Sequence, residues 1–448
     1  MCKYITKTEN EQEKSLFSFS EPLCGKKLKV DFSAPDLSSN GGLLLVKAAD
    51  NTFLDKISQC IPDNRNELFI VHSITEMVSQ RVGQIMCGYE DANDCDTLRH
   101  DSALKMMVGR LPSGVDLCSQ PTMTRLENSV SARSLYNIDV SFVKNFVSSF
   151  TKAPKRIILD VDDTNSNTYG AELSLFNNYY GEYCYMPTLI FDGMTGKMIL
   201  PVLRPGRRNK TANIFGILRR VTEYLHTCWP HTIIELRGDS HFCSHEFMDY
   251  VHDKIYLRFT TGLSGNSALL KRVEKQKRRA ESDFGKTGNS ILRYYKLDYK
   301  ASSWKYEQRV VAKVEVNTKG TNIRFVVTSN RNNTPETIYH HYCQRGEMEL
   351  WIKDLKCLKG DRMSCGKFRA NQFRLFLHAA AYVLIQSMKN NMFKGSDINN
   401  FTTDSFIKRI MLSAVHIQEK KTFIRVSFMN DHRHRKEIEN SLIKLFAA

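Results

Sequence analysis

The order of apolar patterns after Pro154 limits the possible folds of this 448-residue sequence more than any other feature. The strand pattern "RIILDVDD" (156–163) is followed by two more strand patterns joined by "DGMTG", which is a hairpin signal. Helix, strand, helix and strand patterns then continue to "IYLRFTTGL" (255–263). Because strands that alternate with helices build a sheet covered by helices, we predict an α/β fold around a mixed sheet.

The sequence on either side of this core has different patterns. The N-terminal third has mainly helical apolar spacing, and a segment between two parts of the core contains "ILRYYKLDY" and "YEQRVVAKVEV", which are typical of strands. We therefore expect a helical N-terminal region and an inserted β-rich subdomain. The expected boundaries are 1–150 for the N-terminal region, 151–263 and 321–430 for the core, 264–320 for the insertion and 431–448 for a C-terminal tail.

The composition indicates a polyanionic partner. Lys and Arg total 64 against 48 Asp and Glu, which gives a net charge of +16. Nucleic acid is the first candidate, because cations that neutralise phosphates release counterions. No apolar run reaches the roughly 18 residues of a membrane span, and the 12 cysteines include no C-x-x-C pair. We expect a soluble cytoplasmic protein with reduced thiols and no membrane partner.

Three carboxylates follow the first core strand, in "RIILDVDDTN" (156–165). Side chains alternate along a strand, so Asp160 and Asp162 share one face and Asp163 lies on the other. Neighbouring carboxylates repel unless a cation lies between them, and hard ions such as Mg²⁺ take oxygen ligands of this kind. Two enzyme classes could use such a strand.

The first class is the haloacid-dehalogenase-like phosphatases, whose opening motif D-x-D-x-T is matched by "DVDDT". In that family Asp160 would be the nucleophile and Asp162 an acid/base. The family also needs a later lysine and an acidic pair after another strand. "RGDSHF" offers Asp239 but no second acid in the six residues that follow, so this alternative is remote.

The second class is a nuclease-like phosphoryl transferase, in which carboxylates from separate elements hold two metal ions. Asp162 ends the first strand and Asp239 ends "TIIELRGD". If the two strands are parallel neighbours, their ends meet at one edge of the sheet. This hypothesis requires a third acid on a later element.

The segment "YCQRGEMELWIKDLK" (342–356) supplies that acid. If the segment is one α-helix, four polar side chains fall within a sector of roughly 60° beside an apolar face. An acid flanked by cations and a phenol suits a metal ligand beside phosphate-binding groups. The four are Tyr342, Arg345, Glu349 and Lys356.

This spacing, Y-x2-R-x3-E-x6-K, resembles the signature of a group of bacterial insertion-sequence DDE transposases. Further blocks are similar to the same family, among them "LDVDDT", "NNYYGEYCYMPTLIFDGMTGKMILPVLRPG", "LRGDSHF" and "FVVTSN". The resemblance covers roughly residues 35–430 and implies an RNase H-like core. In that core the first strand gives the first Asp, the fourth strand gives the second, and a late helix gives the Glu.

The resemblance implies that Asp162, Asp239 and Glu349 are catalytic and hold two Mg²⁺ ions, with Mn²⁺ as a substitute. The family pattern apolar-D-x-T selects Asp162, with Asp160 and Asp163 as lesser candidates. A β-rich insertion is expected between Asp239 and Glu349, which are 349 − 239 = 110 residues apart. Tyr342, Arg345 and Lys356 would bind DNA phosphate. Trp304 is either a base-stacking residue, as in related insertions, or a core residue.

The function implied is a transposase that cleaves the ends of an insertion sequence and joins them to target DNA. Its partners would be double-stranded DNA, both terminal inverted repeats and target, and a second copy of the chain in the DNA complex. We expect the N-terminal helices to bind the repeats, in a protein associated with the bacterial nucleoid. The basic run "KRVEKQKRR" (271–279) is a solvated loop or a contact to DNA backbone. The alternatives are a DNA nuclease that does not join strands and a non-catalytic DNA-binding derivative.

Overall fold

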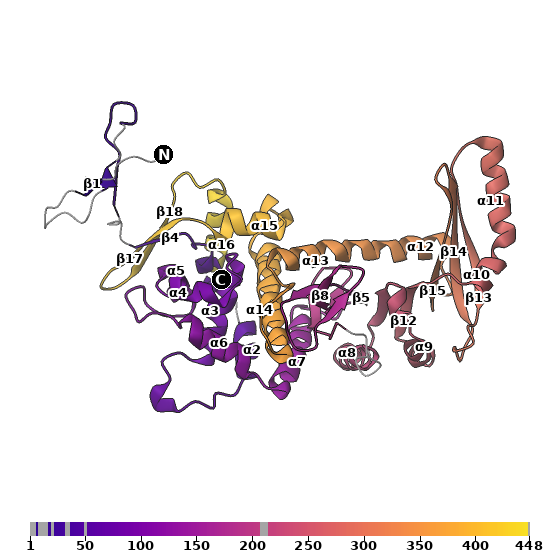
Figure 1. The fold of residues 1–448 in the computed structure, drawn as a ribbon, viewed down its shortest axis with the longest axis horizontal. Coiled ribbons are helices and arrows are strands. Elements are labelled where there is room, and N and C mark those ends of the chain that lie inside the picture. The colour runs from indigo at the N-terminus through magenta and orange to yellow at the C-terminus, as the bar shows by residue number, and fades with distance from the viewer. Residues whose placement is uncertain are drawn as a thin grey trace.

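The centre of the molecule is an eight-stranded mixed sheet (Figure 1). The computed structural model describes residues 6–7, 17–18, 22–31, 36–48, 52–206 and 214–446. In the order in which they lie, the strands are β10 (Met198–Val202), β9 (Thr188–Asp192), β5 (Arg156–Asp163), β11 (Ile233–Gly238), β12 (Leu257–Leu263), β15 (Gly320–Thr328), β14 (Gln308–Asn317) and β13 (Ile291–Tyr299).

Three of these strands, β5, β11 and β12, run parallel to one another, and the remaining pairings are antiparallel. The predicted mixed α/β sheet with helices on its faces is therefore confirmed, as is the hairpin of β9 and β10. Residues 157–161 of β5 and all of β9 are buried. Such continuous burial is typical of strands covered on both faces.

The helices of the N-terminal part of the chain pack together beside the sheet, and we call them the N-terminal body. They are α1 (Leu43–Ala48), α2 (Thr52–Gln59), α3 (Ile74–Met86), α4 (Cys95–Leu98), α5 (Ser102–Met107), α6 (Gln120–Ser129) and α7 (Ala132–Ser148). This body packs around α14 (Phe368–Ser387), which is buried on nearly all sides. A helix that is buried all round belongs in a core, and α14 lies between the N-terminal body and the sheet.

A buried ion triad lies where the N-terminal body meets α14. Glu127 of α6 contacts Arg81 of α3 at 3.2 Å and Arg374 of α14 at 3.3 Å, and all three side chains are almost fully buried. A buried charge is tolerated only when it is paired, so the triad fixes how these three helices meet.

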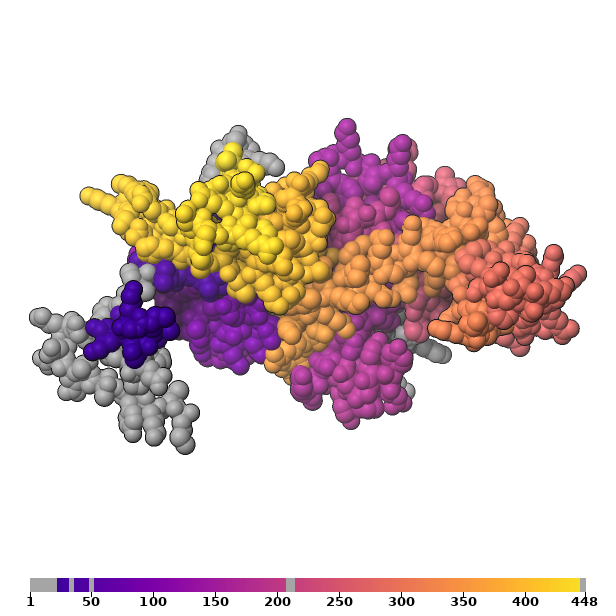
Figure 2. Space-filling view, turned by 90° about the horizontal axis from the view of Figure 1, so that it is seen from above, coloured from indigo at the N-terminus to yellow at the C-terminus, as the bar shows by residue number. Residues whose placement is uncertain are grey.

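A helical rod runs along the sheet from its far end to α14 (Figures 1 and 2). It consists of α12 (Pro335–Cys343), the 3₁₀ turn η5 (Gln344–Glu347) and α13 (Met348–Cys357). Met348, Ile352 and Leu355 of α13 are buried, and α13 packs against α14 and α15. The sequence predicts one continuous helix here, and the structure differs from that prediction at the 3₁₀ turn.

Residues 264–320 also differ from the prediction. We expected a separate β-rich subdomain, but the segment begins with α10 (Ser267–Arg272) and α11 (Glu274–Thr287). Its strands β13 and β14 pair with β15 and extend the central sheet. The salmon-coloured α10 and α11 lie at the end of the molecule opposite the N-terminal body (Figure 2). Pairing to an existing sheet satisfies backbone groups that a free-standing pair of strands would leave at an edge.

The remaining elements are smaller. A second sheet contains β16 (Arg362–Met363), β6 (Ser166–Thr168), β8 (Glu182–Tyr185) and β7 (Leu175–Asn177), and a third contains β18 (Ile424–Phe428), β17 (Val415–Glu419) and β4 (Leu37–Ser38). Short strands β1 (Thr6–Lys7), β2 (Phe17–Ser18) and β3 (Lys29–Val30) form a fourth. The other helices are α8 (Phe215–Cys228), α9 (His245–His252), α15 (Thr403–Phe406) and α16 (Arg435–Phe446). Within the described residues, none of the helices has the length and apolar character needed to cross a bilayer.

Candidate active site at the carboxyl ends of β5 and β11

The ends of two neighbouring parallel strands bring two aspartates together. In the register of β5 and β11, Val161 is opposite Gly238, so the next residues, Asp162 and Asp239, follow at the same level. The side chains of Asp162 and Asp239 are 18% and 26% exposed. This is the arrangement that the sequence predicts if the two strands are parallel neighbours.

The carboxylate of Asp162 lies in a mixed electrostatic environment. Burial is the largest effect and raises its pKa to about 6. The charge of Asp239 also raises this pKa, whereas Arg345, whose Nη1 donates to Asp162 Oδ2 at 2.8 Å, lowers it. A carboxylate in these surroundings is stabilised by an additional cation, because a cation offsets both the burial and the neighbouring negative charge.

Asp239 is held by the short turn that follows β11. Its Oδ1 accepts from the backbone N–H of His241 at 2.8 Å, and His241 Nδ1 lies 3.0 Å from Oδ2. Asp239 thereby caps the 3₁₀ turn Ser240–Phe242. The cap fixes the direction of this carboxylate beside Asp162 while leaving the site open to solvent.

The two lesser candidates on β5 are engaged elsewhere. Asp160 makes a two-point pair with Arg237, both contacts at 2.6 Å, and both side chains are fully buried. On the other face of the strand, Asp163 accepts from Thr188 at 2.6 Å and from Arg204 at 2.7 Å. Of the three carboxylates Asp162 is the most exposed, at 18% against 0% for Asp160 and 7% for Asp163.

Two members of the helical signature reach this site. Arg345 carries the contact to Asp162, and although burial works against its charged form, the charges of Asp162 and Asp239 raise its pKa. Burial raises the pKa of Tyr342, and the charge of Asp239 adds to the rise. A Cβ at Gly262 of β12 would lie 2.8 Å from the Tyr342 hydroxyl, so only glycine allows this close approach.

Lys356, the last member of the signature, lies along the same edge. Its Nζ donates to Asn165 Oδ1 at 2.9 Å, and Asn165 follows Asp162 by three residues. Asn165 also donates through Nδ2 to Glu182 of β8. The lysine is therefore connected to the strand end rather than to the two aspartates themselves.

Glu349 is not brought to the aspartates. Its side chain is exposed at the start of α13, and among the described residues no hydrogen bond or ion pair of Glu349 is found. The part of the chain that the structure describes contains no group of three or more His, Cys, Asp or Glu side chains arranged to hold a metal ion. At this edge of the sheet, Asp162 and Asp239 provide oxygen ligands of the kind that divalent cations take.

The 3₁₀ turn explains why Glu349 departs from the expected line of side chains. Residues in a 3₁₀ turn advance about 120° each instead of about 100°, so four of them add about 80° of rotation. Arg345 lies within the turn and Glu349 follows it. Arg345 therefore faces the sheet together with Met348, while Glu349 is turned away from that direction.

The other candidates from the sequence lie far from this edge. Trp304 is buried and packs edge-to-face on Tyr299 at 5.4 Å, which favours the core alternative. The basic run 271–279 lies on α10 and α11 rather than in a loop. It carries i,i+4 ion pairs such as Arg278–Glu274 at 2.9 Å.

The sequence analysis did not predict the contacts by which residues of β11 hold the helical rod next to the two aspartates. Arg237 Nη1 donates to the backbone carbonyl of His341 at 2.8 Å, and the His341 ring lies 3.0 Å from Glu235 Oε1. These contacts attach the helical rod to β11. Strand alternation was the available signal, because Glu235, Arg237 and Asp239 share one face of "IIELRGD".

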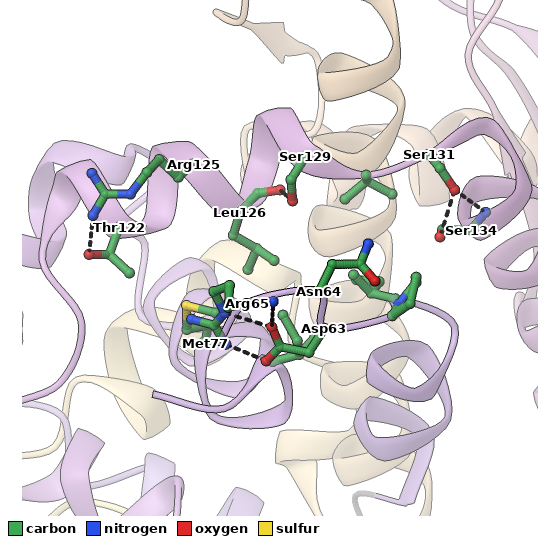
Figure 3. Close-up of a pocket in the computed structure, with 14 residues that line it drawn as sticks. Asp63, Asn64, Arg65, Met77, Thr122, Arg125, Leu126, Ser129, Ser131 and Ser134 are labelled. Atoms are coloured by element: carbon green, nitrogen blue, oxygen red, sulfur yellow. Dashed lines mark hydrogen bonds and ion pairs between the residues drawn. The ribbon is translucent and has the colours of Figure 1, made fainter. Parts of the chain in front are cut away.

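A separate cavity of about 330 Å³ lies within the N-terminal body (Figure 3). Asp63 and Arg65 pair with each other at 2.6 Å in its lining, and Ser131 caps α7 by accepting from Ser134 N–H at 3.1 Å. The Arg65 charge is thus balanced locally. The cavity is lined by the α2–α3 connection and by α6 and α7, so it does not include the carboxylate edge.

Similarity to known proteins extends over most of the chain. A family model described as transposase DDE domain group 1 matches residues 20–448. Among solved structures, the chain is similar to the cryo-electron microscopy structure of the piggyBac transposase synaptic complex with hairpin DNA, with a TM-score of 0.46 and 10% identity over 83% of this chain and 79% of that chain. No curated protein matches the chain. Because the family model spans nearly the whole sequence, the chain belongs to the family of transposase DDE domain group 1.

Proposed function

We propose that this chain is a DNA transposase that cleaves the ends of a mobile element and joins them to target DNA. The observation that carries the proposal is the in-register pair Asp162 and Asp239, which faces Arg345 and Tyr342 of the helical rod. Membership of the DDE transposase family supports it. The substrate would be double-stranded DNA, as the net charge of +16 favours.

We further propose that the core is RNase H-like. In chain order, the first five long strands are β5, β9, β10, β11 and β12. In the sheet they lie side by side as β10, β9, β5, β11 and β12, so the third strand of the chain comes first, then the second, the first, the fourth and the fifth. Asp162 comes from the first of them, Asp239 from the end of the fourth, and Glu349 from a later helix. This matches the plan expected from the family resemblance.

The carboxylates fit divalent cations, because two oxygen-rich side chains face each other in a partly desolvated place. Asp162 and Asp239 would hold Mg²⁺, or Mn²⁺ in its place, and Glu349 would complete the set. When bound, a pair of such ions activates the attacking oxygen and stabilises the leaving oxygen of a phosphodiester. The chain's own part is to fix the carboxylates and to orient the DNA.

Arg345, Tyr342 and Lys356 would orient that DNA. Arg345 is a planar donor suited to phosphate, and its present partner Asp162 is a single contact at 2.8 Å that a phosphate could replace. Lys356 lies beyond Asp162 on the same edge, held by Asn165. A DNA backbone lying along this edge would contact first Arg345 and then Lys356.

We propose that Glu349 joins the aspartates when the 3₁₀ turn rewinds into α-helix. Rewinding the four residues Gln344–Glu347 reverses the rotation of about 80° that turns Glu349 away. Gly346 lies within this turn, and a Cβ there would meet nothing within 4 Å, so there is open space beside the turn at this position. If a DNA phosphate replaced Asp162 as the partner of Arg345, this change would be favoured.

The finer assignments rest on the resemblance of "YCQRGEMELWIKDLK" to the signature of bacterial insertion-sequence transposases. We propose that the substrates are terminal inverted repeats and a target duplex, and that two copies of the chain act together on DNA. The N-terminal helices would bind the repeats. Nucleoid association in a bacterium would follow from DNA binding.

The test is a strand-transfer assay with labelled DNA from the two flanks of the reading frame, in the presence of Mg²⁺. We expect Asp162→Asn, Asp239→Asn and Glu349→Gln to abolish both cleavage and joining. Glu347→Gln is the matched control, since Glu347 is an exposed acid two residues before Glu349. Full activity of the Glu349→Gln protein would refute the assignment of the third acid.

The same assay separates the alternatives. Cleavage without joined products would identify a nuclease that does not transfer strands. Binding without cleavage by the unaltered protein would identify a non-catalytic DNA-binding derivative. Joined products that depend on all three acids would establish the transposase.

A further inference from the structure

A cluster of exposed aromatic rings lies on the small sheet that follows β5. It consists of four side chains that are between 38% and 88% exposed, which we call the aromatic patch. Large aromatic side chains gathered at the surface of one hairpin mark a contact site, because single exposed rings are ordinary but clusters are not. The aromatic patch is Phe176, Tyr179, Tyr180 and Tyr183.

The rings of the patch are held in place by backbone geometry. Phe176 of β7 is directly opposite Tyr183 of β8, and their ring centroids are 5.4 Å apart. Tyr179 and Tyr180 lie in the connecting turn, with ring centroids 4.9 Å apart and planes at 89°. The patch thus presents rings in two directions.

A side-chain cap fixes this turn. Asn177 Oδ1 accepts from the backbone N–H of Tyr179 at 2.9 Å and of Tyr180 at 3.4 Å. Gly181 closes the turn with a φ of +70°, a conformation that favours glycine. Rings on a capped turn lose little conformational entropy when they bind a ligand.

The patch borders the carboxylate edge. Glu182 of β8 accepts from Asn165, and Asn165 accepts from Lys356 at 2.9 Å, so the hairpin and the helical rod share one hydrogen-bonded connection. Burial raises the pKa of Tyr180, and the charges of Tyr179, Asp162 and Asp163 add to the rise. Tyr180 is therefore close enough to Asp162 and Asp163 to feel their charges.

We propose that the aromatic patch is a stacking platform for unpaired bases of a DNA strand whose backbone lies along the carboxylate edge. This inference rests on the proposed function, because it takes the ligand to be DNA. Every base has a π-face, so aromatic rings bind unpaired nucleotides with little regard to sequence. A base can reach a ring only after it leaves the duplex stack.

Charge favours DNA over a protein occupant. Lys356 and Arg345 lie on the edge next to the patch, and Arg204 lies behind it at Asp163. Rings next to a row of cations match the alternation of bases and phosphates along one strand. The buried Trp304 offers no such surface.

The experiment compares DNA binding by the wild-type protein and by the double variant Tyr179→Ala/Tyr180→Ala. The first probe, called the forked probe, is a 30-base-pair duplex of arbitrary sequence with four unpaired nucleotides at one end. The second is the same duplex fully paired. The third is the forked probe with abasic residues at the unpaired positions. Binding is measured by fluorescence anisotropy in EDTA, so that no cleavage is needed.

We expect the double variant to bind the forked probe at least about tenfold more weakly than wild type does, the loss of one or two base–aromatic stacks. Binding to the paired probe should change less than about twofold, since stacking is absent there. Tyr179→Phe/Tyr180→Phe should retain wild-type binding, because it keeps both rings. Wild-type protein should lose its preference for the fork when the unpaired positions are abasic.

Tyr136→Ala is the matched control, because Tyr136 is 50% exposed on α7 and lies outside the patch. Equal losses on forked and paired probes, or an unchanged preference for the fork, would overturn the proposal. So would a double variant that binds DNA normally but changes its oligomeric state in sedimentation, which would make the patch a protein interface. Since these readouts need no catalysis, they can fail while the strand-transfer assay succeeds, and the reverse.

Discussion

Two aspartates on the same face of β5, Asp160 and Asp162, each pair with an arginine, and the two pairs differ in burial and in the number of contacts. Asp160 and Arg237 make two contacts of 2.6 Å with both side chains at 1% exposure or less. Asp162 and Arg345 make one contact of 2.8 Å, with 18% and 19% exposure. One pair is closed off from water and the other remains accessible.

The difference shows how a strand can carry structure and chemistry on adjacent positions. A buried ion pair is stable only when its geometry is good and further hydrogen bonds satisfy the remaining donors. Arg237 meets this condition through the carbonyl of His341 and through Gln344. A partly exposed pair with one contact has neither constraint, so Arg345 can exchange Asp162 for another anion.

The largest expected effect comes from breaking the buried pair. Asp160→Asn leaves Arg237 as an uncompensated buried charge, and we expect a loss of about 3–5 kcal/mol in the free energy of unfolding. Asp162→Asn should change it by less than about 1 kcal/mol. Chemical denaturation of both variants measures the difference, and equal losses would show that the two pairs are not distinct in kind.

The second prediction tests the packing around the buried pair. A Cβ at Gly193 would lie 2.7 Å from Arg237 Nη2 and closer still to Asp160 Oδ2. We expect Gly193→Ala to destabilise the protein by about 1–3 kcal/mol, because neither charged group has room to move. Gly216→Ala in α8 is the control, since a Cβ there meets nothing within 4 Å and should stabilise slightly. Similar melting temperatures for the two variants would argue against a rigid pair.

The third prediction concerns the accessible pair and metal. Mg²⁺ at about ten times its Kd should stabilise the wild-type protein by about 1.4 kcal/mol, because binding to the folded state adds RT ln(1 + [L]/Kd). The double variant Asp162→Asn/Asp239→Asn should show no such gain in thermal melting. Arg345→Ala should bind Mg²⁺ more tightly than wild type does, since it removes the competing cation from Asp162. Weaker binding by Arg345→Ala would refute the competition.

The smallest effect is a dependence of stability on pH. The pKa of Asp162 is raised to about 6, so folding favours its protonated form, and its contribution is lost as pH rises from about 4 through about 6. In EDTA, Asp162→Asn should therefore gain about 1 kcal/mol over wild type between pH 5 and 7.5, less than the full linkage value because the side chain still contacts water.

For Glu235 on the neighbouring strand β11, the pKa is shifted in the opposite direction to that of Asp162. Its pKa is lowered to about 2 because bonding to His341 and the charge of Arg156 outweigh the effect of burial, which raises it. Its contribution is present above about pH 4.5 and is lost only as pH falls through about 2. Glu235→Gln should thus be less stable than wild type throughout the range from pH 5 to 7.5. A parallel pH profile for the two variants would contradict the assigned environments.

Strand alternation alone predicts much of this arrangement. It places Asp160 and Asp162 on one face, and the strand-helix order predicts that Asp162 and Asp239 meet at one edge. It does not reveal which aspartate is paired, because that depends on Arg237 lying opposite Asp160 in the register of β11. The register follows from tertiary packing, and one sequence does not contain it.

Helical periodicity fails where the backbone geometry changes. An ideal α-helix puts Arg345 and Glu349 in one sector, but the 3₁₀ turn Gln344–Glu347 separates them. The same limit applies to residues 264–320, whose strands are predicted but whose attachment to the central sheet is not. Trp304 illustrates a third limit, since residue type alone does not tell a core aromatic from an exposed one.

The attachment of β13 and β14 to the central sheet has a geometric consequence. Four strand-to-strand steps separate β5 from β14, and a sheet twists by about 20–25° at each step, so its surface turns by about 80–100° between them. The cations of α11, which packs on β14, therefore point in a direction well away from that of Asp162. Duplex DNA is stiff over about 150 base pairs, so a straight segment cannot lie flat against both places, and touching both would require curved DNA or a second duplex.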